Sequence, residues 1–176
     1  ANWYAGRLER ARAHYRSQRA TAESVGDEFH AAQSLRFEAM LVAYDARVST
    51  GSPGTERSIV DPDVERAWRL AERSRAISSR RADPMSLAQS SVATAMVSVT
   101  AGDWSGAVRD AADAVAFSRR QFDVFVLRTA LPVVALRALQ RGEPGEAAAV
   151  LGWYLDLLDR TEQTHSMAGA DLAVRA

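Results

Sequence analysis

The sequence contains no cysteine and no lysine, and Asn2 is its only asparagine. Without cysteine, the chain cannot form disulfides, thiolate zinc sites or a cysteine nucleophile. Without lysine, it cannot form the phosphate loop that requires Gly-Lys. No stretch approaches the ~20 apolar residues of a membrane span, and the N-terminus lacks the residue order of a secretion signal. These absences predict a soluble, cytoplasmic protein that does not enter a membrane.

Neither sign of charge is in excess, because the sequence contains 22 arginines and 22 acidic residues. Domains that bind nucleic acids usually carry a basic surplus on one face, so no direct contact with nucleic acid is expected. The first expected helix nevertheless has the strongest claim to an anionic partner. It carries Arg7, Arg10, Arg12, Arg16 and Arg19.

Helical periodicity is the main positive signal. Trp104, Ala107, Ala111 and Val115 recur at helical spacing, and Arg109 falls on the opposite side. No segment alternates between apolar and polar residues in the way that a strand does. The sequence therefore predicts an all-α protein.

Proline and glycine are few and mark the helix ends. An acidic residue precedes proline at Pro62, Pro84 and Pro144, where the acid can cap the first helical turn. Glycines at 26, 102 and 142 are placed to end helices. Eight helices are expected, near 2–24, 27–48, 62–80, 84–101, 103–120, 123–141, 144–161 and 164–176. The segment 49–60 is expected to be a flexible insertion loop, since it contains Gly51, Pro53 and Gly54.

An internal repeat of about 40 residues links these helices. Gly102 is followed by Ala107, Ala111 and Ala114, and Gly142 is followed at the same intervals by Ala147, Leu151 and Tyr154. Weaker copies contain Ala11 and Ala67 at the first of these positions. Small residues at fixed intervals allow successive helix pairs to stack closely.

The run Ala95, Gly102-Asp103-Trp104, Ala107, Ala111 resembles a tetratricopeptide repeat (TPR). The resemblance implies one domain over residues 1–176, a right-handed superhelix of about four antiparallel helix hairpins. The period departs from the usual one of about 34 residues, and the closing proline is absent. The long helices are similar to those of the TPR-like arrays in large bacterial transcriptional regulators. An unrelated alanine-rich bundle is the alternative.

The repeat register also suggests a fragment of a larger array. The chain begins in the second helix of a hairpin and ends in the first helix of another, and neither helix has the polar character of a cap. We expect further repeats in a longer protein, or a homo-oligomer formed through the uncapped ends.

Residues with catalytic or metal-binding chemistry are scarce. The histidines are His14, His30 and His165, and no pair of them is spaced to chelate a metal on one helix. Glu162 and His165 have the spacing of a di-iron ligand pair, but a second copy is missing. The prediction is a protein that is not an enzyme and needs no cofactor or metal.

In the TPR-like register, the first helix of each hairpin lines a concave groove. The predicted groove residues are Gln89, Val92, Met96, Thr100, Arg128, Thr129, Leu136 and Gln140. Family members that hold a peptide carboxylate use lysine and asparagine in such positions, and this chain lacks them there. We therefore expect a largely apolar groove that binds a partner protein, a peptide or another domain of the same polypeptide. The alternative is a domain that senses a small ligand or peptide in a regulator coupled to an ATPase or a helix-turn-helix domain.

Overall fold

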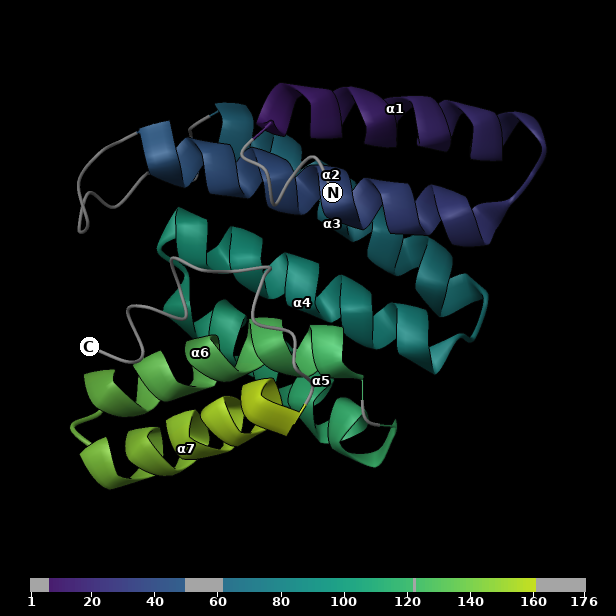
Figure 1. Ribbon diagram of the computed structural model, residues 1–176. Coiled ribbons are helices and arrows are strands. Elements are labelled where there is room, and N and C mark those ends of the chain that lie inside the picture. The colour runs from purple at the N-terminus through teal and green to yellow at the C-terminus, as the bar shows by residue number, and fades with distance from the viewer. Residues whose placement is uncertain (1–6, 50–61, 122, 161–176) are drawn as a thin grey trace.

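The computed structural model describes residues 7–49, 62–121 and 123–160, which form seven α-helices and no strand (Figure 1). The all-α prediction is confirmed. Residues 161–176, which include the eighth expected helix, lie outside the described residues. The helices are α1 (Leu8–Ser24), α2 (Glu28–Ser49), α3 (Pro62–Arg80), α4 (Pro84–Ala101), α5 (Trp104–Gln121), α6 (Val124–Gln140) and α7 (Pro144–Arg160).

The helices that begin at an acid and proline pair match their predicted bounds best. Both α3 and α4 begin and end at the predicted residues. Asp83 caps α4, since its carboxylate accepts hydrogen bonds from the backbone N–H groups of Met85 and Ser86. Ser49 is the last residue of α2, and the rest of the predicted loop 49–60 lies outside the described residues.

Four turns repeat one backbone geometry. Each contains a residue with positive φ, namely Gly26, Ala82, Gly102 or Gly142. The N–H of the next residue then donates to the carbonyl five residues earlier, which satisfies an end of the preceding helix. These bonds join Asp27 to Ala22, Asp83 to Ser78, Asp103 to Ser98 and Glu143 to Ala138.

Acidic residues recur at a fixed interval in the second half of the chain. Asp83, Asp103, Asp123 and Glu143 are spaced by 20 residues, and each stands directly before a helix. Asp103 and Asp123 accept backbone hydrogen bonds from Gly106 and Val126, in the manner of Asp83. The 40-residue repeat of the sequence is therefore two helices of 20 residues each, including their turns.

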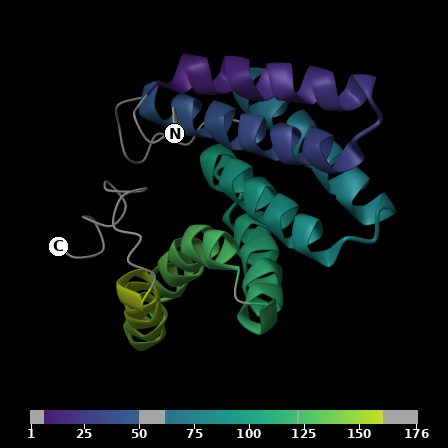
Figure 2. The ribbon, with the colours of Figure 1, turned by 45° about the vertical axis from the view of Figure 1, so that its right-hand side comes forward.

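Every helix packs against the next one along the chain, and α4 also packs against both α2 and α6. The helices α2, α4 and α6 form a row and run in the same direction in Figure 1. In Figure 2, α5 and α7 point in a different direction from α1 and α2. The helix direction thus changes along the array.

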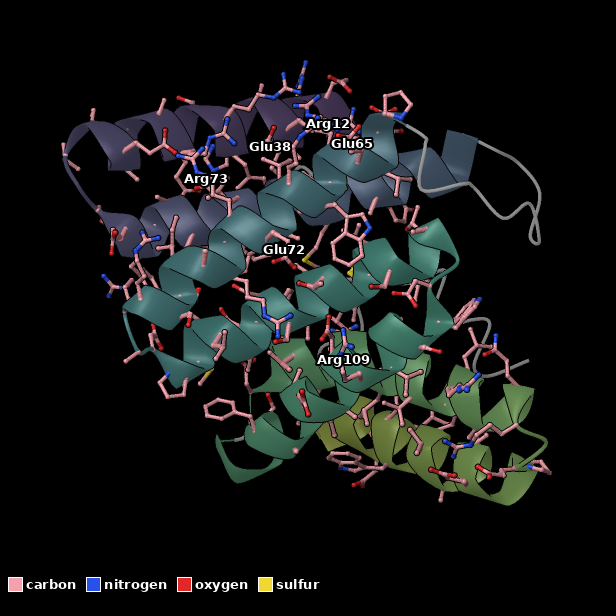
Figure 3. All side chains as sticks on the ribbon, turned by 180° about the vertical axis from the view of Figure 1, so that it is seen from behind. Arg12, Glu38, Glu65, Glu72, Arg73 and Arg109 are labelled. Carbon is pink, nitrogen blue, oxygen red and sulfur yellow. The ribbon has the colours of Figure 1, made fainter. Side chains whose placement is uncertain are left out.

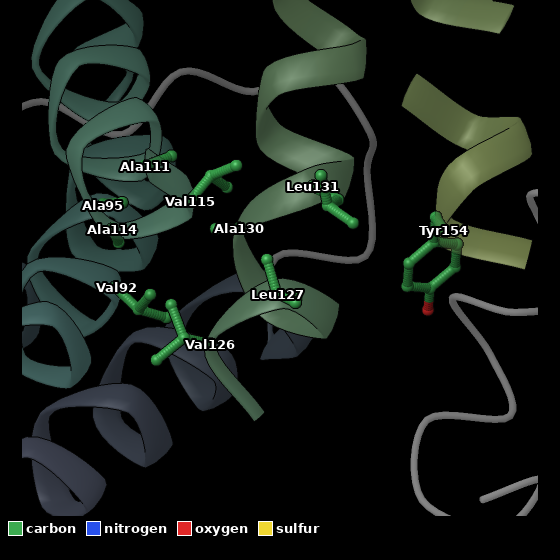
Figure 4. Packing of buried hydrophobic residues seen from close by; sticks show 10 residues of the cluster. All are labelled: Val92, Ala95, Ala111, Ala114, Val115, Val126, Leu127, Ala130, Leu131 and Tyr154. Atoms are coloured by element: carbon green, nitrogen blue, oxygen red, sulfur yellow. The ribbon is translucent and has the colours of Figure 1, made fainter. Parts of the chain in front are cut away.

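Two clusters of buried residues share α4. One joins α4 to α2 and α3 through Val97, Ala43 and Ala67. The other joins α4 to α5, α6 and α7 and includes Leu127 and Tyr154 (Figure 4). The small residues at the first repeat position are all buried, as their role at helix contacts requires. They are Ala11, Ala67, Ala107 and Ala147.

Pro132 lies inside α6, a position where proline often kinks or breaks a helix. The helix continues through Pro132 from Val124 to Gln140. Within the described ranges, no helix combines the length and the apolar character that crossing a membrane requires.

Candidate functional site

The row formed by α2, α4 and α6 is the candidate site, because these helices carry the predicted groove residues and their neighbours. On α4, Gln89 donates a hydrogen bond of 2.9 Å to Asp123, at the start of α6. The Thr100 hydroxyl donates to the carbonyl oxygens of Met96, at 3.0 Å, and of Ala43 on α2, at 3.5 Å. These two α4 residues therefore connect the three helices of the row.

The eight predicted residues differ widely in exposure. Val92 and Arg128 are buried, and Val92 belongs to the cluster that α4 shares with α5, α6 and α7. Gln89, Met96, Thr100 and Thr129 are half-buried, whereas Leu136 and Gln140 are exposed. The α4 members of the set are thus at least half-buried, whereas the last two α6 members are open to solvent.

Large exposed apolar side chains gather on the same row. Four such residues occur in the described part of the chain, and three of them lie on α2 and α6. Tyr44 on α2 is 43% exposed, and Leu136 and Leu139 on α6 are 38% and 50% exposed. We call these three residues, with Met96 and Thr100 of α4 between their helices, the open apolar face.

Aromatic rings close the other end of the row. The ring of Phe37 on α2 lies 5.6 Å from that of Phe125 on α6, in an edge-to-face arrangement. Phe37 also stacks on Tyr15 of α1, with centroids 5.1 Å apart. Tyr44 follows Phe37 by seven residues and Leu136 follows Phe125 by eleven, so each pair shares one side of its helix. The open apolar face therefore continues the line of this aromatic contact.

These aromatic residues were not among the predicted groove residues. The predicted groove residues come only from the helices expected at 84–101 and 123–141, although the same register places 27–48 in the same row. Phe37 and Phe125 are 88 residues apart, and their meeting depends on the way in which α4 spaces its two neighbours. Applying the register to every first helix would have singled out Phe37.

Arg36 on α2 is 2% exposed and is the largest side chain among those that the described residues bury almost fully. Burial lowers its pKa to about 10, and the charges of Asp123 and Asp83 oppose that shift. The guanidinium carbon lies 5.7 Å from the centroid of the Phe37 ring. A positive charge is thus buried beside the aromatic end of the row.

The opposite side of α2 carries the main ion-pair cluster (Figure 3). Glu38 is 1% exposed and accepts hydrogen bonds from Arg19, at 2.8 Å, from Arg66, at 2.9 Å, and from Arg16, at 3.3 Å. Arg12 pairs with Glu9 and Asp45. Three of the five arginines that suggested an anionic partner for the first helix are therefore paired within the chain.

The described residues contain no group of three or more His, Asp or Glu side chains that could hold a metal ion. Asp27 and His30 form a close pair, with Oδ2 and Nδ1 2.6 Å apart. The hydrogen bond from the His30 backbone N–H, followed by the one from its side chain, lowers the pKa of Asp27. Asp27 also accepts from the His30 backbone N–H, so the pair serves as a cap for α2.

The sequence matches no family model and no curated protein.

Proposed function

We propose that the chain is a non-catalytic, TPR-like helical-repeat module that binds a partner protein, a peptide or another domain of its own polypeptide. In this proposal, α2, α4 and α6 line the concave side of a right-handed superhelix of hairpins. The proposal is supported by the acids that precede successive helices at intervals of 20 residues, from Asp83 to Glu143, and by the contacts of α4 with both α2 and α6. Repeat arrays of this kind use such rows as extended binding surfaces.

The open apolar face is the observation that carries the proposal. Exposed apolar side chains scattered singly are ordinary, but a group of them on neighbouring elements marks a site of interaction. Tyr44 and Leu136 stand on the two outer helices of the row, and half-buried Met96 stands on the middle one. A segment with an apolar side, such as an amphipathic helix, fits this face best.

A selected peptide provides the test. Peptides from a displayed random library would be selected on the wild-type chain, and their affinity measured by fluorescence polarisation. We expect Leu136→Arg to weaken binding about tenfold or more, because a charge replaces a central apolar contact. The control is Val25→Arg, since Val25 is 73% exposed in the turn after α1, away from the row. Equal binding by wild type and Leu136→Arg would contradict the proposed face.

A second candidate function is the sensing domain of a bacterial transcriptional regulator. The observation in its favour is that the two buried clusters share only α4, while Phe37 and Phe125 make a further contact across the row. A ligand that parted these rings would change the angle between the two halves of the array. Because the chain has no cysteine, spin labels at Arg10→Cys and Ala149→Cys would report the distance between α1 and α7. A distance that stays constant on peptide binding would count against sensing by this route.

A further inference from the structure

Arg36 is in an unusual state for a buried charge. Its Nε and Nη1 atoms have no hydrogen-bond partner among the described residues, although the side chain is 2% exposed. An arginine carries five N–H donors and stays charged at neutral pH. Burying such a group without acceptors is unfavourable, so an unpaired example requires a specific explanation.

The two carboxylates whose charges act on Arg36 are engaged elsewhere. Asp83 accepts from the Ser86 hydroxyl and caps α4, and Asp123 accepts from Gln89 and caps α6. Neither of them accepts a hydrogen bond from Nε or Nη1 of Arg36. Their negative charges are offset in part by the positive ends of the helices that they cap. The guanidinium therefore retains its capacity to bind a further acceptor.

The aromatic contact lies next to this guanidinium. Phe37 follows Arg36 in α2, and its ring meets that of Phe125 on α6. Contacts between α2 and α6 are few, since α4 stands between them. Separating the two rings would open a way to Arg36 from the row and would place aromatic surface on both sides of an entering molecule.

We propose that Arg36 binds an oxyanion, the carboxylate or phosphate group of a small ligand, which enters between α2 and α6 where Phe37 meets Phe125. Guanidinium groups hold both kinds of oxyanion through charge-assisted hydrogen bonds. This inference goes beyond the proposed function, because it concerns a small ligand beneath the aromatic end of the row rather than a peptide on the open apolar face.

The test uses two probes that distinguish the sources of the oxyanion. Inorganic phosphate and benzoate are titrated separately into the wild-type chain, with sodium chloride at matched ionic strength as the reference. We expect at least one of them to raise the melting temperature by about 2 °C or more beyond chloride. The same probe should shift the Arg36 Nε–Hε signal in nitrogen-15 NMR spectra. A response to benzoate alone assigns an aromatic carboxylate, and a response to phosphate alone assigns a phosphate group.

Three variants locate the effect. Arg36→Gln and Arg36→Met should each weaken the apparent affinity for the probe at least about tenfold. If Arg36→Gln does not fold, Arg36→Met alone provides the comparison with wild type. Arg69→Gln is the control, since Arg69 is an exposed arginine on α3, and it should stay within about twofold of wild type. Equal responses of the wild type to chloride, phosphate and benzoate would overturn the proposal. An anion response that survives Arg36→Met would also overturn it. Neither result depends on peptide binding, which Leu136→Arg tests separately.

Discussion

Phe37 of α2 and Phe125 of α6 meet edge to face across the row of helices, with ring centroids 5.6 Å apart and planes inclined by 67°. Aromatic pairs in this geometry contribute beyond the area that they bury. The contact joins α2 to α6 without passing through α4, and Phe125 packs against the buried cluster that α4 shares with α5, α6 and α7.

The double substitution Phe37→Ala with Phe125→Ala should therefore be non-additive. We expect a coupling free energy of about 0.5–1.5 kcal/mol from a double-mutant cycle measured by urea unfolding. Phe29→Ala combined with Phe125→Ala is the control, since the ring of Phe29 meets His30 instead. That pair should be additive within about 0.5 kcal/mol. A cycle that closes to zero for Phe37 and Phe125 would show that the rings do not meet in solution.

Glu38→Gln should lower the free energy of unfolding by about 1–3 kcal/mol, because the variant loses charge-assisted bonds from arginines of both α1 and α3. The arginines are partly exposed and can be solvated, which keeps the loss below that of a fully buried pair. Glu65→Gln is the matched control, since Glu65 pairs with Arg69 on the surface of α3. Its effect should be below about 0.5 kcal/mol. Equal losses in the two variants would show that burial of Glu38 adds nothing.

Ala82→Gly should stabilise the chain. Ala82 has a φ of 50°, whereas glycine occupies the equivalent position in three other turns. The left-handed conformation costs a non-glycine residue about 1–2 kcal/mol, and glycine avoids this cost. Glycine also loses more conformational entropy on folding than alanine, which offsets part of the stabilisation. We expect a net increase of about 0.5–1 kcal/mol in unfolding free energy, and a decrease of about 1 kcal/mol for the reverse change, Gly102→Ala. Destabilisation by Ala82→Gly would contradict the geometry of this turn.

Asp83→Ala should cost about 1 kcal/mol at neutral pH, through loss of the α4 cap. Hydrogen bonding, first of all from the Ser86 hydroxyl, lowers the pKa of Asp83 in the folded chain. The stabilisation is therefore complete above the unfolded value of about 3.9 and is lost as pH falls toward the folded value. Urea unfolding of wild type and variant at pH 7, 5 and 3 should show the difference shrinking below pH 4. A difference that grows on acidification would have the wrong sign.

Ala107→Arg should unfold or aggregate the chain, because Ala107 is fully buried at the repeat position of α5. Ala112→Arg on the same helix is the control, since Ala112 is exposed and its replacement adds the same charge and volume to solvent. Circular dichroism melting curves compare the two. We expect the Ala112 variant to melt within a few degrees of wild type, and an equally stable Ala107 variant would remove the packing role of the repeat.

Local signals account for the parts of the fold that the sequence predicted well. An acid followed by proline places the starts of α3 and α4, because proline suits the first helical turn and the acid caps it. Glycine marks three of the repeated turns, because it adopts positive φ without steric strain. The turn at Ala82 has no such mark, since alanine seldom adopts positive φ, and only its hydrogen bonds reveal that it belongs to the series.

The candidate site was predicted only in part, because burial depends on what lies opposite a side chain. Met96 and Leu136 were placed in the groove from their register, and they lie on the row formed by α2, α4 and α6. Val92 has the same register, yet it is buried in the cluster that α4 shares with α5 and α6. Arg36 and Glu38 are charged residues that a sequence pattern assigns to solvent, whereas α2 is covered on both sides and buries them.

The helical character of the chain and most of the helix ends can be predicted from the sequence. These properties follow from residues close together in the chain. In contrast, the contact of Phe37 with Phe125 and the burial of Arg36, with Nε and Nη1 lacking hydrogen-bond partners among the described residues, are visible only in the folded chain. Such relationships join residues far apart in the sequence, and they depend on how α2 and α6 pack on α4, which no local pattern encodes.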